Sequence, residues 1–152
     1  MSLQDNPGSH RWIGPLLRLA GLAIFVLAFF AAAVLHEDRT YSGWKCASVA
    51  TTMVMTMCSK PGDHYEPFQF MVAMSGLINP LVLLTLLASP VRALRILRLV
   101  FGGAIAICMV ATWVLFAQQH IAPLIGHFMW IAGALLIVIP DLLPRGQRQR
   151  LA

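Results

Sequence analysis

Hydrophobic residues gather into four long runs along the chain, separated by polar segments. The runs cover about residues 13–35, 68–89, 99–117 and 121–139, and each contains 19 to 23 residues. A helix needs about 20 apolar residues to cross roughly 30 Å of hydrocarbon. The pattern therefore predicts an all-α fold, in which residues 13–144 form an integral membrane bundle of four transmembrane helices.

Three of the predicted spans contain a charged, amide or imidazole side chain. Arg18 lies one turn inside the first run, where its long side chain can reach back to the headgroups. The second run contains Asn79-Pro80, and a proline inside a helix removes one backbone hydrogen bond. His127 lies within the fourth run. Asn79, Pro80 and His127 form a candidate intramembrane polar site, which either fills a helix kink or contacts a ligand or ion.

The first run also has a basic start, an apolar centre and the small residues 31–33, which together fit a signal peptide. We interpret the run as a membrane anchor that is retained.

Residues 36–67 form the one long polar segment between the runs, and we expect it to be a structured outer loop. Cys46 and Cys58 bound an uncharged stretch inside it. Residues twelve apart in a helix lie about 18 Å apart, whereas a disulfide needs Cα atoms within about 7 Å. A helix therefore implies free thiols, and a Cys46–Cys58 disulfide implies a hairpin. β-branched residues favour the hairpin and apolar residues at helical spacing favour the helix, so both alternatives stay open.

The composition supports the membrane assignment. Of the 152 residues, 59% are hydrophobic and 11% are charged, whereas soluble domains carry about 25% charged residues. The net charge of +5 does not indicate nucleic-acid binding, because the basic residues flank the apolar runs rather than form one cluster.

The distribution of charge predicts the orientation. Four spans place both termini and residues 90–98 on one side, with eight basic and two acidic residues, against three basic and four acidic residues on the other side. Because basic residues accumulate on the cytoplasmic side, we expect residues 1–12 and the basic tail 145–152 to be cytoplasmic. Arginines 92, 95 and 98 have the spacing of a voltage sensor but lie at the inner end of a span. We interpret them as anchors to anionic lipid headgroups.

Candidate metal ligands are scattered along the chain. Imidazole and carboxylate groups suit zinc or copper(II), and four histidines lie at or near the predicted outer face: His36, His64, His120 and His127. No HxxxH or HExxH spacing links them, and interfacial positions explain them without a metal. Alternating methionines at 53–57 beside Cys58 offer sulfur ligands for copper(I), but methionine also fills apolar gaps. We predict no metal site and no cofactor.

Two stretches resemble known families. Gly43-Trp44 with Cys46 and Cys58 resembles the claudin and peripheral-myelin-protein architecture, which implies four spans, cytoplasmic termini and a disulfide in the first outer loop. This chain lacks the leucine of the Gly-Leu-Trp motif and spaces its cysteines differently. The stretch 41–44 followed by 79–81 is similar to small uncharacterised four-span proteins of bacterial inner membranes. With alanine, leucine and arginine usage typical of bacteria, this second resemblance implies a multi-pass protein of the bacterial inner membrane and no particular activity.

No glycine-rich phosphate loop, Gly-x-Ser-x-Gly or Cys-x-x-Cys motif occurs, and few polar groups lie within the predicted spans. We therefore expect a non-catalytic protein, an accessory or structural subunit of a larger membrane complex or a homo-oligomer. Its partners would be the lipid bilayer, other membrane subunits or copies of itself. One alternative is an oligomeric transporter or channel for a small solute or ion, with Asn79, Pro80 and His127 along its route. An outer-face metal-binding protein is a further alternative.

Overall fold

The computed structural model of the protein describes residues 13–142, apart from the side chain at position 92. The described chain is mostly helical, as the hydrophobic pattern predicts. In chain order its elements are α1 (Ile13–Ala28), β1 (Ala32–His36), β2 (Arg39–Ser42), α2 (Gly43–Ser59), α3 (Pro67–Leu87), the short 3-10 helix η2 (Arg92–Leu94), α4 (Arg95–Gln118), β3 (Ala122–Pro123) and α5 (Ile125–Leu142).

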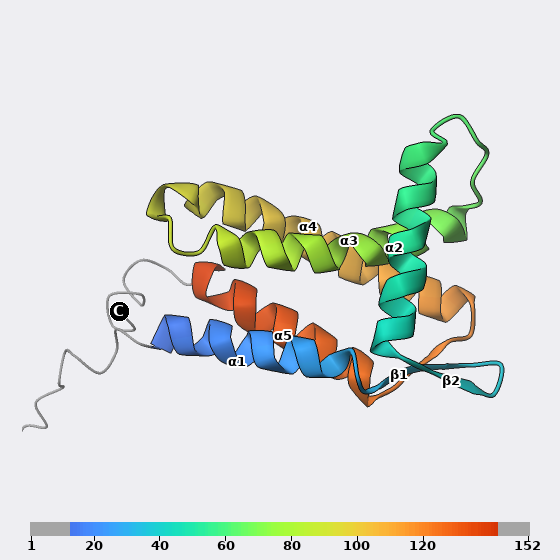
Figure 1. The fold of residues 1–152 in the computed structure, drawn as a ribbon, viewed down its shortest axis with the longest axis horizontal. Coiled ribbons are helices and arrows are strands. Elements are labelled where there is room, and N and C mark those ends of the chain that lie inside the picture. Colours follow the sequence, from blue (N-terminus) through green and yellow to red (C-terminus); the bar gives the residue numbers. More distant parts are fainter. Residues whose placement is uncertain (1–12, 143–152) are drawn as a thin grey trace, which may run out of the picture.

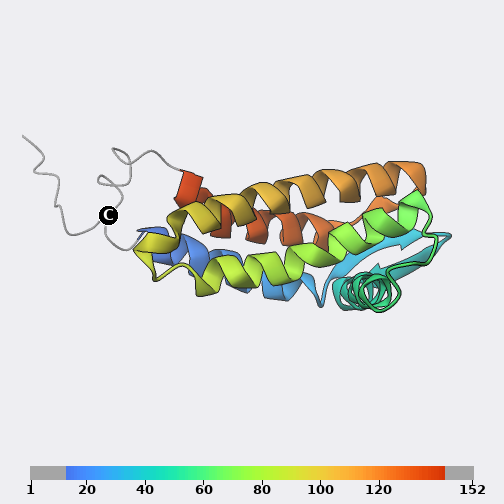
Figure 2. The same ribbon diagram turned by 90° about the horizontal axis from the view of Figure 1, so that it is seen from above.

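Four helices, α1, α3, α4 and α5, run along the long axis of the molecule, and α2 lies across them at one end (Figure 1). Figure 2 shows the same crossing from above, where α2 is seen along its own axis. We call the end that carries α2 and the strands the sheet end. The opposite end, where α1 and α4 begin and α5 finishes, is called the charged end.

Three helices are long and apolar enough to cross a membrane. They are α3 with 21 residues, α4 with 24 and α5 with 18, with mean hydropathies of 2.1, 2.3 and 1.8. The chain is therefore a multi-pass membrane protein. The apolar helix α1 is shorter, at 16 residues, which corresponds to about 24 Å.

The ends of the first and fourth apolar runs differ from the predicted helices. The first run was expected to be helical over 13–35, but α1 ends at Ala28 and the rest of the run forms β1. Backbone N–H groups of Gly43 and Trp44 donate to the carbonyls of Ala31 and Phe29, at 3.0 and 2.7 Å, and hold the chain away from a helical path. The fourth run begins four residues before α5, because its first residues include β3.

The strands form a small antiparallel sheet in the order β2-β1-β3, which a purely helical prediction does not contain. Glu37 and Asp38 connect β1 to β2 with φ values of 47° and 60°, the backbone twist that favours a two-residue hairpin. On the other edge of β1, Val34 and Leu35 are opposite the two residues of β3. The sheet therefore joins the α1–α2 connection to the α4–α5 connection.

Glycines allow two close helix contacts. A Cβ atom at Gly133 of α5 would lie 2.8 Å from the Gly21 carbonyl oxygen of α1, and one at Gly76 of α3 would lie 2.7 Å from the Ala50 carbonyl oxygen of α2. Small residues at helix contacts are typical of membrane proteins, where backbones approach closely and gain dispersion energy. These contacts hold α1 against α5 and α2 against α3.

A buried ionic cluster joins the helices at the charged end. Asp141 of α5 has a side chain that is 1% exposed, and its two carboxylate oxygens accept from Arg98 Nε at 3.0 Å and Arg18 Nη2 at 2.8 Å. Arg98 Nη1 also donates to the carbonyls of Ala88 and Val91, at 2.7 and 2.8 Å. The cluster thus links α1, α4 and α5 to the connection between α3 and α4.

The interpretation of Arg98 as a headgroup anchor is therefore wrong. Its side chain is 5% exposed and lies inside the protein, because a carboxylate and two carbonyl oxygens within hydrogen-bond distance replace the water it loses. Arg18 likewise points to Asp141, although 18% of its side chain stays exposed.

Replacing Asp141 by leucine should strongly destabilise the protein. The change leaves Arg98 buried without its carboxylate, and breaking a buried ion pair in this way costs about 3–5 kcal/mol. Thermal unfolding of the purified protein in mild detergent measures the effect. Asp63→Leu is the matched control, because Asp63 is exposed. Equal midpoints for the two variants would contradict a stabilising role for the cluster.

Candidate functional site

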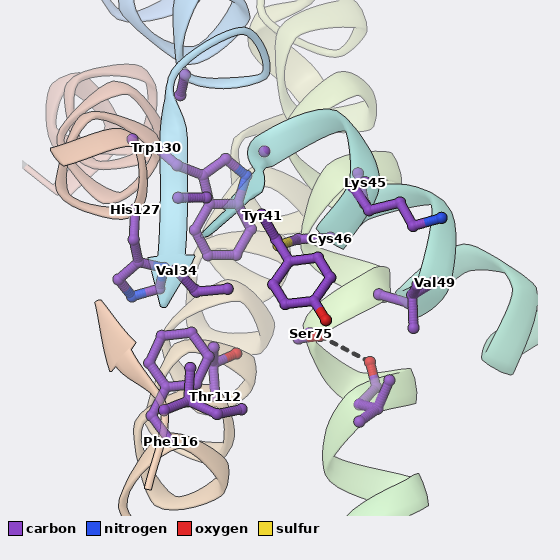
Figure 3. A pocket seen from close by; sticks show the side chains of 18 of the residues that line it. Val34, Tyr41, Lys45, Cys46, Val49, Ser75, Thr112, Phe116, His127 and Trp130 are labelled. Carbon is purple, nitrogen blue, oxygen red and sulfur yellow. Dashed lines mark hydrogen bonds between the residues drawn. The ribbon is translucent and has the colours of Figure 1, made fainter. Parts of the chain in front are cut away.

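A cavity of about 360 Å³ opens at the sheet end, between the hairpin, α2 and the ends of α3, α4 and α5 (Figure 3). Most of its walls are apolar: Phe29, Val34, Ala50, Leu115, Phe116 and Trp130. A mainly apolar cavity of a few hundred Å³ with a small number of polar groups is typical of small-molecule sites. It is therefore the candidate functional site of the chain.

His127 lies in the wall of this cavity near the start of α5. It is 5% exposed, and its ring centroid lies 4.7 Å from that of Phe116, 5.5 Å from Trp113 and 5.6 Å from Trp130. Its Nε2 atom is buried and has no hydrogen-bond partner among the described residues. The aromatic rings around the imidazole thus leave one buried polar atom without a partner among the described residues.

Asn79 lines the same cavity from α3. Its Oδ1 accepts a hydrogen bond from Trp130 Nε1 at 3.1 Å, across 51 residues of sequence. Trp130 therefore lies between the two predicted polar residues, Asn79 on one side and His127 on the other. Pro80 lies inside α3, which continues through it to Leu87, and is not among the lining residues.

Two hydroxyl groups in the cavity wall are already used as donors. Ser75 Oγ donates to the Val72 carbonyl at 2.7 Å, the bond drawn in Figure 3. Thr112 Oγ1 donates to the Cys108 carbonyl at 2.9 Å. A hydroxyl has one proton and two lone pairs, so each of these oxygens can only accept a further bond from a molecule in the cavity.

The charged groups that line the cavity are basic. Lys45 of α2 is exposed, and His36 of β1 lies 3.9 Å from the carboxylate of Glu37. No aspartate or glutamate is among the lining residues. The cavity therefore offers no counter-charge to a cation.

The four histidines proposed as metal ligands are not brought together. His36 and His127 both line the cavity, whereas His64 lies in an exposed connection and His120 in the turn after α4. Within residues 13–142, no three histidine, cysteine, aspartate or glutamate side chains are arranged to hold a metal ion.

The stretch between Cys46 and Cys58 takes the helical alternative. Both cysteines lie in α2 and both are free, because one helix holds them too far apart for a disulfide. Cys46 lines the cavity and Cys58 is exposed outside it. Burial raises the pKa of the Cys46 thiol above its ordinary value.

Ser42 and Lys45 have the Ser-x-x-Lys spacing found in some acyl-transfer enzymes. In this structure Ser42 is the N-cap of α2, and its Oγ accepts from the Lys45 backbone N–H at 3.4 Å. The pair therefore has a clear structural role at the start of the helix.

The sequence interpretation missed most of the cavity wall, because its residues come from seven separate helices and strands and two connections. The stretch Tyr41–Cys46 contributes to the wall, but only the structure shows that it lines the same cavity as residues of α4 and α5. Comparison of the chain with protein-family models, curated proteins and solved structures finds no match.

We expect the three cysteines to differ in reactivity toward a water-soluble maleimide. Cys58 should react first, and Cys46 roughly tenfold more slowly at neutral pH, because burial restricts both its access and its thiolate fraction. Cys108 is buried within α4 and should react last. Because the pKa of Cys46 is raised, its labelling rate should keep increasing with pH after an ordinary thiol is fully deprotonated.

Peptide mass spectrometry after timed labelling gives each rate in the same sample. Labelling of Cys46 and Cys58 only after reduction would show a disulfide and would contradict the helical arrangement of α2.

Proposed function

We propose that the protein is a non-catalytic four-span membrane protein of the bacterial inner membrane, with α1 as its first span. In this orientation the sheet end lies on the outer side of the membrane. The common direction of α1, α3, α4 and α5 supports four spans. Arg18, Arg95 and Arg98 lie toward the charged end, whereas Glu37 and Asp38 lie in the hairpin at the sheet end. This distribution supports a cytoplasmic charged end, with both termini on that side.

We further propose that the protein is an accessory subunit that packs against another membrane protein or a second copy of itself. One observation carries this proposal: two small residues, Gly103 and Ala106, lie on the outward face of α4. A Cβ atom at Gly103 would meet nothing within 4 Å, and the neighbouring Ala106 is also exposed. Small side chains that face outward make few contacts with lipid, but they let the backbone of another helix approach closely.

The ionic cluster at the charged end, and the apolar core between it and the cavity, favour assembly over transport. Asp141, Arg98 and Arg18 are bonded to one another there, and the cavity with its polar groups lies at the opposite end of the helices. A continuous polar route would need further polar residues between them, whereas buried core side chains fill that length: Phe25, Ile78, Val82, Ile105 and Ile137.

Transport remains the second candidate function, because Asn79 and His127 line one cavity. In that case an oligomer would complete the route, and the cavity would be its outer entrance.

Gly103→Leu should weaken association by about tenfold, which corresponds to roughly 1.4 kcal/mol. The leucine fills the outward surface without meeting any part of its own chain. The measurement is the mass and composition of the complex purified from its membrane in mild detergent. Gly14→Leu is the matched control, because a Cβ there also meets nothing within 4 Å. An unchanged complex in Gly103→Leu, or no complex in the unmodified protein, would contradict the assembly role.

Flux into liposomes separates the second candidate from the first. If the protein transports a solute, purified protein should support uptake, and Asn79→Leu should abolish it by removing the polar pair with Trp130. We expect no uptake above that of protein-free liposomes. Uptake that Asn79→Leu abolishes would replace the accessory role with transport.

A further inference from the structure

The cavity at the sheet end contains a polar atom that the described protein leaves without a partner. His127 Nε2 is buried and makes no hydrogen bond there. One indole N–H among the surrounding rings, Trp130 Nε1, is already bonded to Asn79. A buried polar group without a partner costs free energy. A ligand that reaches Nε2 would remove that cost.

The other polar atoms of the cavity define what such a ligand must offer. Ser75 and Thr112 have given their protons to carbonyls of their own helices, so their oxygens can only accept. The Tyr41 hydroxyl, which also lines the cavity, can both donate and accept. A neutral imidazole nitrogen either donates or accepts, depending on the tautomer. A hydroxyl group satisfies both kinds of partner, because it donates one hydrogen bond and accepts others.

The walls exclude most charged ligands. A cation would find no carboxylate among the lining residues. An anion would have to leave water for walls of Phe29, Phe116 and Trp130, and an unpaired charge in such surroundings is strongly disfavoured. The Lys45 side chain is exposed and its nitrogen points away from the other labelled residues of the cavity (Figure 3).

We propose that this cavity binds a small uncharged molecule that has an apolar body and a hydroxyl group, and that the hydroxyl accepts from His127 Nε2–H and donates its one proton to Thr112 Oγ1. The volume of about 360 Å³ accommodates a fused-ring phenol or a folded alkyl chain, not a whole phospholipid. This binding function goes beyond the proposed assembly and does not depend on it.

Two cysteines of α2 provide an internal assay. Cys46 lines the cavity and Cys58 does not, so a bound molecule should slow modification of Cys46 and leave Cys58 unchanged. The full chain in nanodiscs is labelled with a maleimide in the presence of four probes. A naphthol stands for a free aromatic ligand and dodecanol for a lipid-derived alcohol, and naphthalene and dodecane are their hydroxyl-free counterparts.

At least one hydroxylated probe should protect Cys46 at a concentration roughly three- to tenfold lower than its counterpart, the range expected for one hydrogen bond. Protection by the naphthol indicates a free aromatic ligand, and protection by dodecanol indicates a lipid-derived one. His127→Phe should abolish the difference within the pair, because it keeps a ring but removes Nε2.

A second variant guards against a folding defect in His127→Phe. Thr112→Val keeps the shape of the side chain and removes one acceptor oxygen, and it should reduce the same difference. In both variants the Cys58 rate should match that of the unmodified protein, which reports an intact α2.

Three results would overturn the proposal. Equal protection within each pair would mean that the cavity selects only apolar bulk and that water satisfies His127. Stronger protection by a naphthoate than by the naphthol would mean an anion site. No protection of Cys46 by any probe would mean that the cavity is not a binding site for this class of molecule.

Discussion

The buried carboxylate of Asp141 is the constraint on which the arrangement of the helices depends. A carboxylate at 1% exposure is tolerated only where charged donors replace its water, and those donors, Arg98 and Arg18, come from two other helices. Arg98 extends the requirement to the α3–α4 connection through the carbonyls of Ala88 and Val91. One side chain therefore fixes the relative rotation and height of three helices at the charged end.

The rotation imposed there continues along the helices. On α1, Arg18 and Gly21 are three residues apart and so share one face, which brings Gly21 against Gly133 of α5. On α5, Asp141 and His127 are fourteen residues apart, about 21 Å along the axis and within 40° of the same face. The rotation of α5 that buries the carboxylate at one end thus turns the imidazole into the cavity at the other. The ionic cluster and the candidate site are geometrically coupled.

The sequence predicted what depends on residue type and local order. Long uncharged runs are enough to place α3, α4 and α5, because crossing hydrocarbon requires length and hydropathy alone. The helix over 43–59 was one of two alternatives, since its β-branched residues and its helical spacing gave opposite indications. The strand β1 was hidden in the first apolar run, because alanine, valine and leucine fit a strand as well as a span. One of its two partner strands, β3, lies in the distant α4–α5 connection.

The ionic cluster was hidden for a different reason. Arg98 and Asp141 are 43 residues apart, and each has a sufficient local explanation as a charge near the end of a span. A signal was present, since Asp141 is one of only two acidic residues on the predicted basic side, and an acid so placed among arginines invites an ion pair. His127 was placed among the polar residues of the spans, but the sequence does not show that its Nε2 lacks a partner. That property arises from the rings of α4 and α5 that surround it.

The two ends of the molecule therefore differ in how their buried polar groups are bonded. At the charged end Asp141 bonds to Arg98 and Arg18, and Arg98 also bonds to two backbone carbonyls. At the sheet end it surrounds His127 with rings that cannot bond to Nε2, beside hydroxyl oxygens that can still accept. A buried imidazole nitrogen without a hydrogen-bond partner contributes nothing to stability. The more economical explanation is that the missing partner of His127 comes from outside the protein.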